Sequence, residues 1–207
     1  MTPDPRTDPS RGPLRLAELT ALQAHRLFDS NPRLLVPIGT LLVRGPHLPL
    51  GTDTLVVDRL ADDLSAHTQI VRAPVIPFGV HSASDPDDPG SAGLTRKTLH
   101  RMMNELIAAW EDEAKVREVL ILSTHIGEGH VEALSTIRSA GHVALIDIYG
   151  AQLKDLIGEE APDTVLIEWL APQLISPARH PPPDGAMGAR VYQRLFDHAL
   201  GIISGTS

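Results

Sequence analysis

The sequence predicts an α/β fold, a three-layer α/β/α sandwich with a mostly parallel sheet. Short apolar runs such as 34–39 and 118–123 alternate along the chain with longer segments of helical periodicity such as 98–116. Apolar runs of this length are typical of strands that are buried on both faces. Strands that alternate with helices favour parallel pairing, with helices covering both faces of the sheet.

The first part of the chain predicts two helices and two strands around an irregular loop. Leucines at intervals of three to five indicate the first helix, and Pro32 ends it because proline disfavours helical geometry at the preceding residue. Thr52 or Asp53 is in range to cap the second helix. The expected segments are helix 14–28, strand 34–39, loop 44–53, helix 55–64 and strand 69–79.

The second part continues the alternation after a long polar loop. Gly141 is expected to cap the helix that precedes the last predicted strand. The expected segments are loop 81–93, helix 98–116, strand 116–125, helix 132–140, strand 143–150, helices 151–157 and 164–174, loop 178–188 and helix 189–203.

Composition limits the class of protein. The formal net charge of -8 argues against a nucleic-acid partner, because phosphate contacts need clustered Lys and Arg. The absence of cysteine excludes disulfides and thiolate metal sites. No signal peptide or membrane-spanning run is visible, so we expect a cytoplasmic protein without membrane contact. Residues 1–13 predict a disordered proline-rich arm, and residues 14–207 one α/β domain.

The candidate site is expected beyond the carboxyl ends of the strands, where ligands bind in sheets of this type. Two unusual loops lie there: Gly-Pro-His-Leu-Pro-Leu-Gly-Thr-Asp at 45–53 and Ser-Thr-His-Ile-Gly-Glu-Gly-His at 123–130. The first loop must be irregular because of its glycines and prolines. Both loops carry side chains that can bind metals or transfer protons.

The segment 44–49, Arg-Gly-Pro-His-Leu-Pro, followed by Asp53, resembles the creatininase (creatinine amidohydrolase) family. Members of that family carry Glu-x-His-Gly-Pro-His-Leu-Pro after a strand and an Asp a few residues later. Further landmarks follow in the family's order: Pro-Phe-Gly at 77–79, Pro-Gly-Ser at 89–91 and the strand end Leu-Ser-Thr-His at 122–125. The resemblance covers residues 30–175 and implies a creatininase-like fold.

The resemblance implies only part of the family's two-metal site. Asp53 stands at the position of the bridging aspartate ligand and His125 at that of the strand-end histidine. Leu42 and Arg44 replace a glutamate and a histidine ligand, and neither side chain can bind a metal. Gly127 stands where creatininases place another ligand glutamate, with Glu128 one residue further. We therefore expect no two-metal site, and either no cofactor or one divalent ion, zinc or manganese.

A single ion would be held by Asp53 and His125, with help from His47, Glu128 or His130. For each residue a structural interpretation stands beside the functional one. Arg44 is either a solvated loop arginine or a fixed positive charge for a substrate carboxylate or oxyanion. A lone histidine such as His47, His81 or His130 is more often a packing residue.

Other residues have structural interpretations that we favour. Asp85, Asp87 and Asp88 resemble a metal cluster, but their proline-rich setting favours a solvated turn. Trp169 can line a pocket, although core packing is the more common role of such a residue. The segment 180–184 can cover a cleft or a subunit contact.

Three functional hypotheses follow. The first is an enzyme on the creatininase scaffold that hydrolyses, cyclises or forms an amide or lactam C–N bond of a small, biosynthetic metabolite. Its catalytic residues would be Arg44, His47, His125 and Glu128. The second is an amidohydrolase with one metal ion, and the third a non-catalytic homologue that binds a small molecule or acts as a scaffold. Members of the family commonly form homo-oligomers, which we expect here too.

Overall fold

The computed structural model describes residues 12–81, 90–125, 127–149, 162–176 and 185–205. Its centre is a sheet of four strands in the order β2-β1-β3-β4, and every pairing between them is parallel. The strands are β1 (Arg33–Ile38), β2 (Val71–Arg72), β3 (Glu118–Ser123) and β4 (His142–Asp147). Their carboxyl ends therefore meet at one edge of the sheet.

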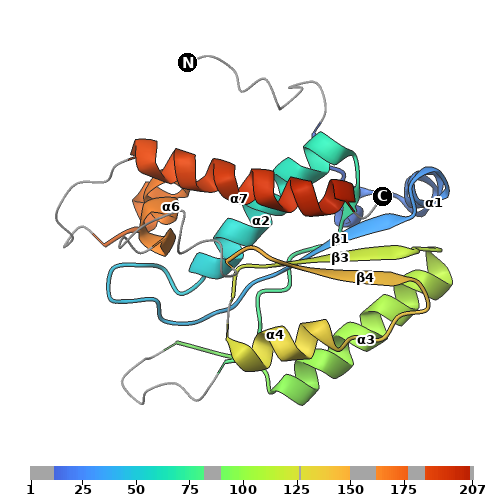
Figure 1. Ribbon diagram of the computed structural model, residues 1–207, viewed down its shortest axis with the longest axis horizontal. Coiled ribbons are helices and arrows are strands. Elements are labelled where there is room, and N and C mark those ends of the chain that lie inside the picture. The colour runs from blue at the N-terminus through green and yellow to red at the C-terminus, as the bar shows by residue number, and fades with distance from the viewer. Residues whose placement is uncertain (1–11, 82–89, 126, 150–161, 177–184, 206–207) are drawn as a thin grey trace.

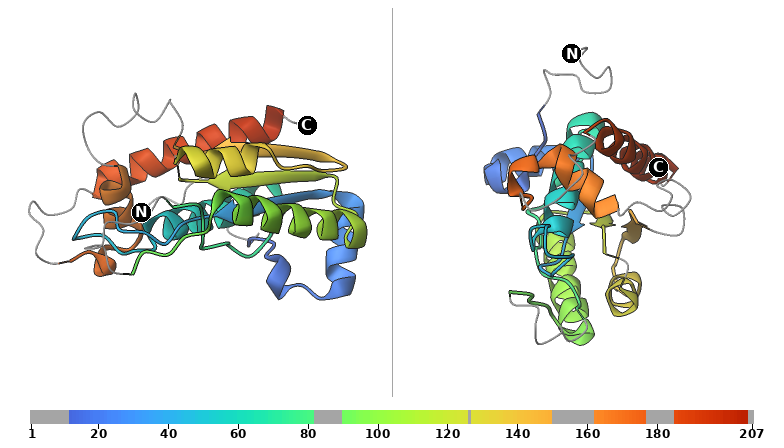
Figure 2. Two further views of the ribbon diagram at one scale, coloured as in Figure 1. Left: turned by 90° about the horizontal axis from the view of Figure 1, so that it is seen from below. Right: turned by 90° about the vertical axis from the view of Figure 1, so that its left-hand side faces the viewer.

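Helices cover both faces of the sheet (Figure 1). One face carries α2 (Thr52–Thr68), α6 (Pro162–Leu170) and α7 (Gly185–Gly205), and the other carries α3 (Arg96–Glu113) and α4 (Glu128–Ser135). The short helix η1 (Leu16–Glu18) and α1 (Ala21–Ser30) precede β1, and η2 (Pro172–Leu174) follows α6. The predicted three-layer sandwich with its parallel sheet is confirmed, and Figure 2 shows the layers from two further sides.

The central strands β1 and β3 are apolar along most of their length, because successive side chains enter the cores on opposite faces of the sheet. In β1, Leu35 packs in the core beneath α2 and α7, whereas Leu34 and Val36 pack in the core beneath α3 and α4. All three side chains are fully buried. This double burial explains the continuous apolar run from which the strand was predicted.

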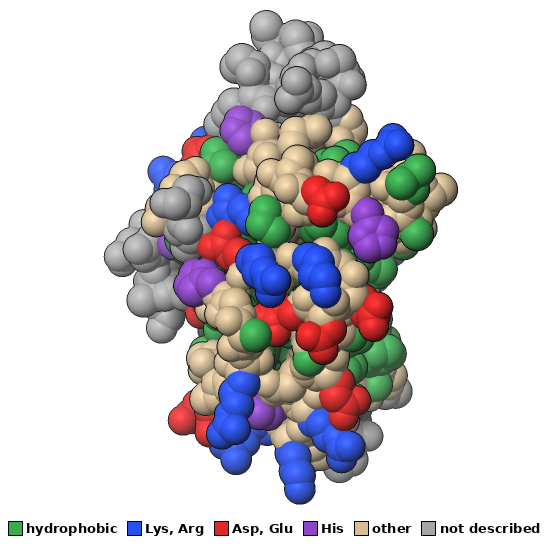
Figure 3. Space-filling view, turned by 90° about the vertical axis from the view of Figure 1, so that its right-hand side faces the viewer, with side chains coloured by type: hydrophobic (Ala, Val, Ile, Leu, Met, Phe, Trp, Pro, Cys, Tyr) green, Lys and Arg blue, Asp and Glu red, His purple; other side chains and the backbone are tan. Residues whose placement is uncertain are grey.

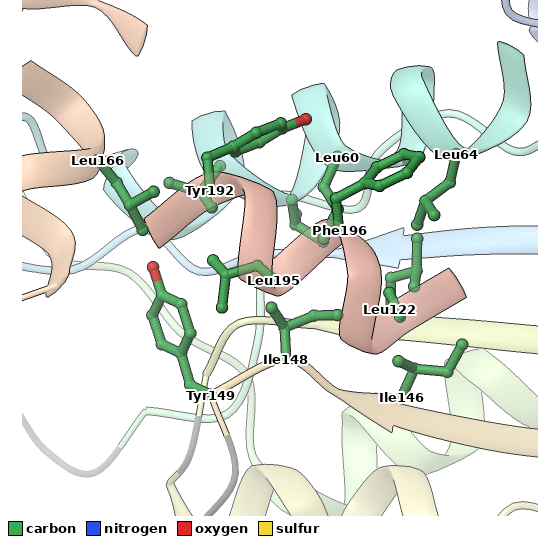
Figure 4. Close-up of a cluster of buried hydrophobic side chains, with 14 of the residues drawn as sticks. Leu60, Leu64, Leu122, Ile146, Ile148, Tyr149, Leu166, Tyr192, Leu195 and Phe196 are labelled. Atoms are coloured by element: carbon green, nitrogen blue, oxygen red, sulfur yellow. The ribbon is translucent and has the colours of Figure 1, made fainter. Parts of the chain in front are cut away.

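The core between the sheet and α7 is the larger of the two clusters of buried apolar residues in the described part of the chain (Figure 4). Leu195 and Phe196 of α7 pack there, together with Leu60 of α2. Trp169 lies against Tyr192 with 4.7 Å between ring centroids, so the tryptophan joins α6 to α7. Burying such apolar area contributes about 25 cal/mol per Å², which makes α7 a main contributor to stability.

Several element boundaries differ from the prediction. The cap of α2 is Gly51, without a side-chain hydrogen bond, so Thr52 and Asp53 lie inside the helix. Helix α4 begins at Glu128, earlier than predicted, because Gly127 already accepts the first helical hydrogen bonds through its carbonyl. β2 contains only Val71 and Arg72.

Gly141 was predicted as a helix cap, and that prediction is wrong. Helix α4 ends at Ser135, and a Cβ on Gly141 would lie 2.3 Å from the carbonyl oxygen of Arg117. The glycine therefore permits a close backbone approach at the entry to β4.

Some predictions fall on residues that the structure does not describe. These are the first residues of the proline-rich arm, the aspartates at 85, 87 and 88, the helix at 151–157 and the loop at 178–184. Gly12 and Pro13, at the end of the predicted arm, are described, and Leu14 directly after them is bound to the domain. The backbone N–H of Leu14 donates to Ser65 Oγ at 2.9 Å, and the carbonyl of Leu14 accepts from the N–H of Arg72 at 2.9 Å.

The amino ends of the strands carry mixed charges rather than a patch of one sign (Figure 3). Arg33 of β1 pairs there with Glu118 of β3, and Arg72 of β2 pairs with Asp58 of α2. Among the described residues, no helix is both long enough and apolar enough to cross a membrane. The described candidates Arg44, Asp53 and His125 lie at the opposite edge of the sheet.

Candidate active site

The loop after β1 is held close to the first turn of α2. A Cβ on Gly39 would lie 2.4 Å from Thr54 Oγ1, so only glycine permits this approach. The hydroxyl of Thr54 donates to the carbonyl of Thr40 at 3.0 Å. Gly45 has a φ angle of 114°, a backbone conformation that residues other than glycine rarely adopt. These constraints bring Arg44 back over the amino end of α2, where Asp53 lies.

Arg44 joins the two residues that the family resemblance singled out. Its Nη2 atom lies 2.9 Å from Oδ1 and 2.8 Å from Oδ2 of Asp53. The same nitrogen lies 3.1 Å from Nδ1 of His125. The carboxylate and the imidazole therefore converge on one guanidinium nitrogen. Residues from the β1 loop, α2 and the end of β3 meet at this point.

Asp53 is a buried carboxylate with a complete set of partners. Its side chain is 1% exposed, and Thr40 Oγ1 donates a further hydrogen bond to Oδ2. Burial raises the pKa of Asp53, but the positive charge of Arg44 and its contacts with both carboxylate oxygens outweigh that effect and hold the pKa below its usual value. The charge of Asp53 raises the pKa of Arg44 in spite of burial. The pair is therefore ionised at neutral pH.

The contact with Arg44 fixes the tautomer of His125. A guanidinium only donates, so Nδ1 accepts the hydrogen bond and Nε2 carries the imidazole proton. Nδ1 also lies 3.5 Å from Asp53 Oδ2, which is a close contact and not a hydrogen bond, because Nδ1 accepts from the guanidinium. A Cβ on Gly127 would lie 2.6 Å from Nε2, so the glycine leaves the protonated side of the ring uncovered.

His130 supports the ring of His125 from behind. The two rings meet edge to face, with 5.0 Å between their centroids. His130 Nδ1 accepts from the N–H of Val80 at 3.1 Å, so Nε2 donates to Ser123 Oγ at 3.1 Å. Burial lowers the pKa of His130 to about 4, which keeps it neutral at pH 7. His130 thus positions the ring of His125, and both of its own ring nitrogens already have hydrogen-bond partners.

Two polar side chains on the far side of Arg44 were not among the sequence candidates. Asp163, in the first turn of α6, places Oδ2 3.7 Å from Arg44 Nε. Tyr149 follows the end of β4 and is 8% exposed. Burial raises the pKa of Asp163 and also that of Tyr149, which the charge of Asp163 raises further. Neither residue belongs to a recognisable motif, so only the tertiary structure brings them to the site.

The other predicted site residues lie outside this cluster of contacts. His47 Nε2 lies 3.2 Å from Thr164 Oγ1, and the His47 carbonyl accepts from the N–H of Ser176 at 3.0 Å. These contacts tie the loop after β1 to α6 and its continuation. Glu128 is exposed at the start of α4, and its partners do not include Arg44, Asp53 or His125.

The residues at this site do not fit the metal pair that the family resemblance implies. Leu42 is buried and has no atom that can bind a metal. The carboxylate of Asp53 and Nδ1 of His125 face one position, and the guanidinium of Arg44 already occupies it. Within the described ranges, no group of three or more His, Asp or Glu side chains is arranged to hold a metal ion. A closed metal site usually needs four ligands, and a catalytic one about three.

Comparison with known proteins settles the family. The family model described as creatinine amidohydrolase matches residues 17–184. The chain belongs to the creatininase family. No curated protein sequence matches it. In this member of the family an arginine side chain lies between Asp53 and His125.

Solved creatininase structures share the fold over nearly the whole chain. A crystal structure of creatinine amidohydrolase aligns with a TM-score of 0.69 at 18% identity, covering 94% of this chain and 96% of that one. A structure described as creatininase Mn aligns with a TM-score of 0.71 at 18% identity, covering 93% and 98%. A putative creatinine amidohydrolase from Bacteroides fragilis aligns with a TM-score of 0.70 at 15% identity, covering 91% and 94%. At these identities the likeness shows the fold alone.

Proposed function

We propose that this protein is an enzyme that acts on an amide or lactam C–N bond of a small biosynthetic metabolite, with Arg44 supplying the fixed positive charge of the site. The family is one of amidohydrolase-like C–N hydrolases. The contact of Arg44 Nη2 with both oxygens of Asp53 and with His125 Nδ1 is the observation that carries the proposal. A solvated loop arginine would not make these buried contacts.

The geometry suggests how such a site polarises a carbonyl group. When a C–N bond at a carbonyl carbon breaks or forms, negative charge gathers on the carbonyl oxygen. The Arg44 side chain is 23% exposed, and its Nη1 has no hydrogen-bond partner among the described residues, so it can donate to that oxygen. Because Asp53 fixes the other end of the guanidinium, the charge needs no reorganisation during the reaction.

His125 acts in this proposal as a hydrogen-bond donor rather than as a base. Its Nδ1 already accepts from Arg44, and only Nε2–H is available to a substrate. A neutral imidazole that donates in this way polarises a carbonyl without transferring its proton. Asp53, which is buried and ionised, holds Arg44 in place and does not transfer protons.

The test is turnover of a panel of lactams, cyclic ureas and linear amides by the purified protein. On a substrate that the wild type converts, Arg44→Ala and His125→Ala should each lower kcat by about 100-fold to 1000-fold, the usual effect of removing an oxyanion donor. The matched control is Arg101→Ala, which removes an exposed arginine of α3 whose ion-pair partner within the described residues is Glu105. The control should keep wild-type turnover.

Two outcomes would overturn the proposal. If both site variants retained wild-type turnover, neither residue would take part in the reaction. If no member of the panel were converted while the protein bound some of them, the non-catalytic homologue would be the better explanation. A homo-oligomer remains part of the proposal, and light scattering of the purified chain tests it.

A further inference from the structure

Three buried polar atoms near Arg44 have no hydrogen-bond partner within the described part of the chain. They are Nε of Arg44, the phenol oxygen of Tyr149 and Oδ1 of Asp163. Native proteins leave few buried polar atoms unpaired, because each one loses its hydrogen bonds to water without replacement. Three such atoms on neighbouring side chains of a candidate active site are therefore unusual.

The three side chains form one group although they come from separate parts of the chain. Arg44 Nε lies 3.7 Å from Asp163 Oδ2, which brings the β1 loop next to the first turn of α6. Asp163 lies close enough to the Tyr149 phenol to raise its pKa, but the two side chains do not meet the geometry of a hydrogen bond. Figure 4 shows that the ring of Tyr149 rises from the end of β4 toward the side where Leu166 of α6 lies.

Their hydrogen-bonding capacities are complementary to an amide group. Arg44 Nε–H and the Tyr149 hydroxyl can donate, whereas the Asp163 carboxylate accepts. A matching ligand must offer an acceptor and an N–H donor side by side. The edge of a lactam, a cyclic urea or a primary amide has this arrangement. A lactone or an N-alkylated lactam lacks the donor, and a carboxylate would face Asp163 with like charge.

We propose that Arg44, Tyr149 and Asp163 form the recognition edge of the site and select substrates whose amide nitrogen carries a hydrogen. This inference rests on the proposed function, because it names the substrate class of the same site. It adds two binding residues and a requirement for a free N–H. It concerns binding alone, so it can be tested without any turnover.

The probes are 2-pyrrolidinone, N-methyl-2-pyrrolidinone and γ-butyrolactone, titrated against the full chain by ligand-observed NMR. The wild type should bind 2-pyrrolidinone about threefold to tenfold more tightly than either of the others, the usual range for one lost hydrogen bond. Asp163→Ala should remove this preference. Tyr149→Phe should weaken binding of 2-pyrrolidinone by about threefold to tenfold.

The matched control is Tyr192→Phe, which removes a hydroxyl that already donates to Asp63 at 2.7 Å. It should leave binding unchanged and lower the melting temperature. Tyr149→Phe should keep or raise the melting temperature, because it removes a buried hydroxyl without a partner. A merely structural Tyr149 would give the opposite result, a lower melting temperature with unchanged binding, and would overturn the inference.

The results also separate this inference from the proposed function. Wild-type protein that binds 2-pyrrolidinone selectively but converts no amide would contradict the function and support the recognition edge. Equal binding of all three probes, or no binding of any, would overturn the recognition edge even if amides were converted.

Discussion

The Nη2 atom of Arg44 lies within 2.9 Å of both carboxylate oxygens of Asp53. One nitrogen thus neutralises a carboxylate whose side chain is 1% exposed. Removing one partner of a buried ion pair is costly because the other charge stays buried without compensation. The consequences of this contact for stability, metal binding and the shape of the site can all be measured.

Arg44→Ala should lower the free energy of unfolding by about 3–5 kcal/mol, the usual cost of leaving a buried charge unpaired. Urea unfolding at pH 7, followed by circular dichroism, measures the change. The double variant Arg44→Ala/Asp53→Ala should be more stable than Arg44→Ala, since it also removes the carboxylate that Arg44→Ala leaves buried and unpaired. Arg101→Ala should leave the urea midpoint unchanged. A midpoint for Arg44→Ala equal to that of the wild type would show that the pair does not form in solution.

Metal content follows from the same contact. Protein purified without a histidine tag should contain less than about 0.1 zinc or manganese ion per chain, because two ligands are too few for a catalytic site. Elemental analysis measures the content, and EDTA should not change the melting temperature. A stoichiometric ion whose removal lowers the melting temperature would favour the one-metal amidohydrolase instead.

Replacing the guanidinium by a ligand should create metal affinity. Arg44→His places a third ligand beside Asp53 and His125, which gives the three protein ligands of an open zinc site. Zinc should then raise the melting temperature of this variant by mass action and leave the wild type unaffected. Arg101→His is the control for nonspecific binding to a surface histidine. Equal shifts in the two variants would show that the ion does not bind between Asp53 and His125.

Gly127 should tolerate no side chain, because a Cβ there would lie 2.6 Å from His125 Nε2. Gly127→Ala should displace the imidazole and cost about 1–3 kcal/mol of stability, the range for overpacking. Gly129→Ala, two residues further along in α4, is the matched control. Its Cβ would meet Val80 at 3.5 Å, an ordinary contact, and alanine inside α4 should be neutral or stabilising. Thermal unfolding of the two variants makes the comparison, and equal melting temperatures would contradict it.

Glu111 gives a pH dependence away from the site. Its carboxylate accepts hydrogen bonds from Ser139 and from the backbone N–H groups of Ala140 and Gly141. Burial raises the pKa of Glu111, but these hydrogen bonds outweigh burial and lower it below its usual value. The folded pKa is therefore below the unfolded one, so the stabilisation is complete above about pH 4.3 and is lost as the pH falls through the folded pKa.

The measurement compares the wild type with Glu111→Gln, which cannot ionise. The variant should be less stable at pH 7, and the difference in unfolding free energy should shrink as the pH falls below about 4. A difference that stays constant from pH 7 to the acid limit would show that the carboxylate is not stabilised by these contacts.

The sequence by itself determined the fold class and the place of the site. The apolar runs of β1 and β3 reflect burial on both faces of the sheet. Central strands of a parallel sheet have this pattern, so it can be recognised from the local sequence. Parallel strands align their carboxyl ends, so Asp53 and His125 could be expected near each other. Boundaries such as the early start of α4 depended on backbone contacts at Gly127 that no periodicity reveals.

Only the tertiary structure decided what lies between those two residues. The sequence allows Arg44 to be a solvated loop residue or a fixed charge for a substrate. The structure shows its guanidinium held by Asp53 and His125 instead of by solvent alone. Tyr149 and Asp163 carry no local signal, because their role depends on contacts between the end of β4, the start of α6 and the β1 loop. Such contacts join segments that are distant in the chain, and the packing of the helices on the sheet sets them.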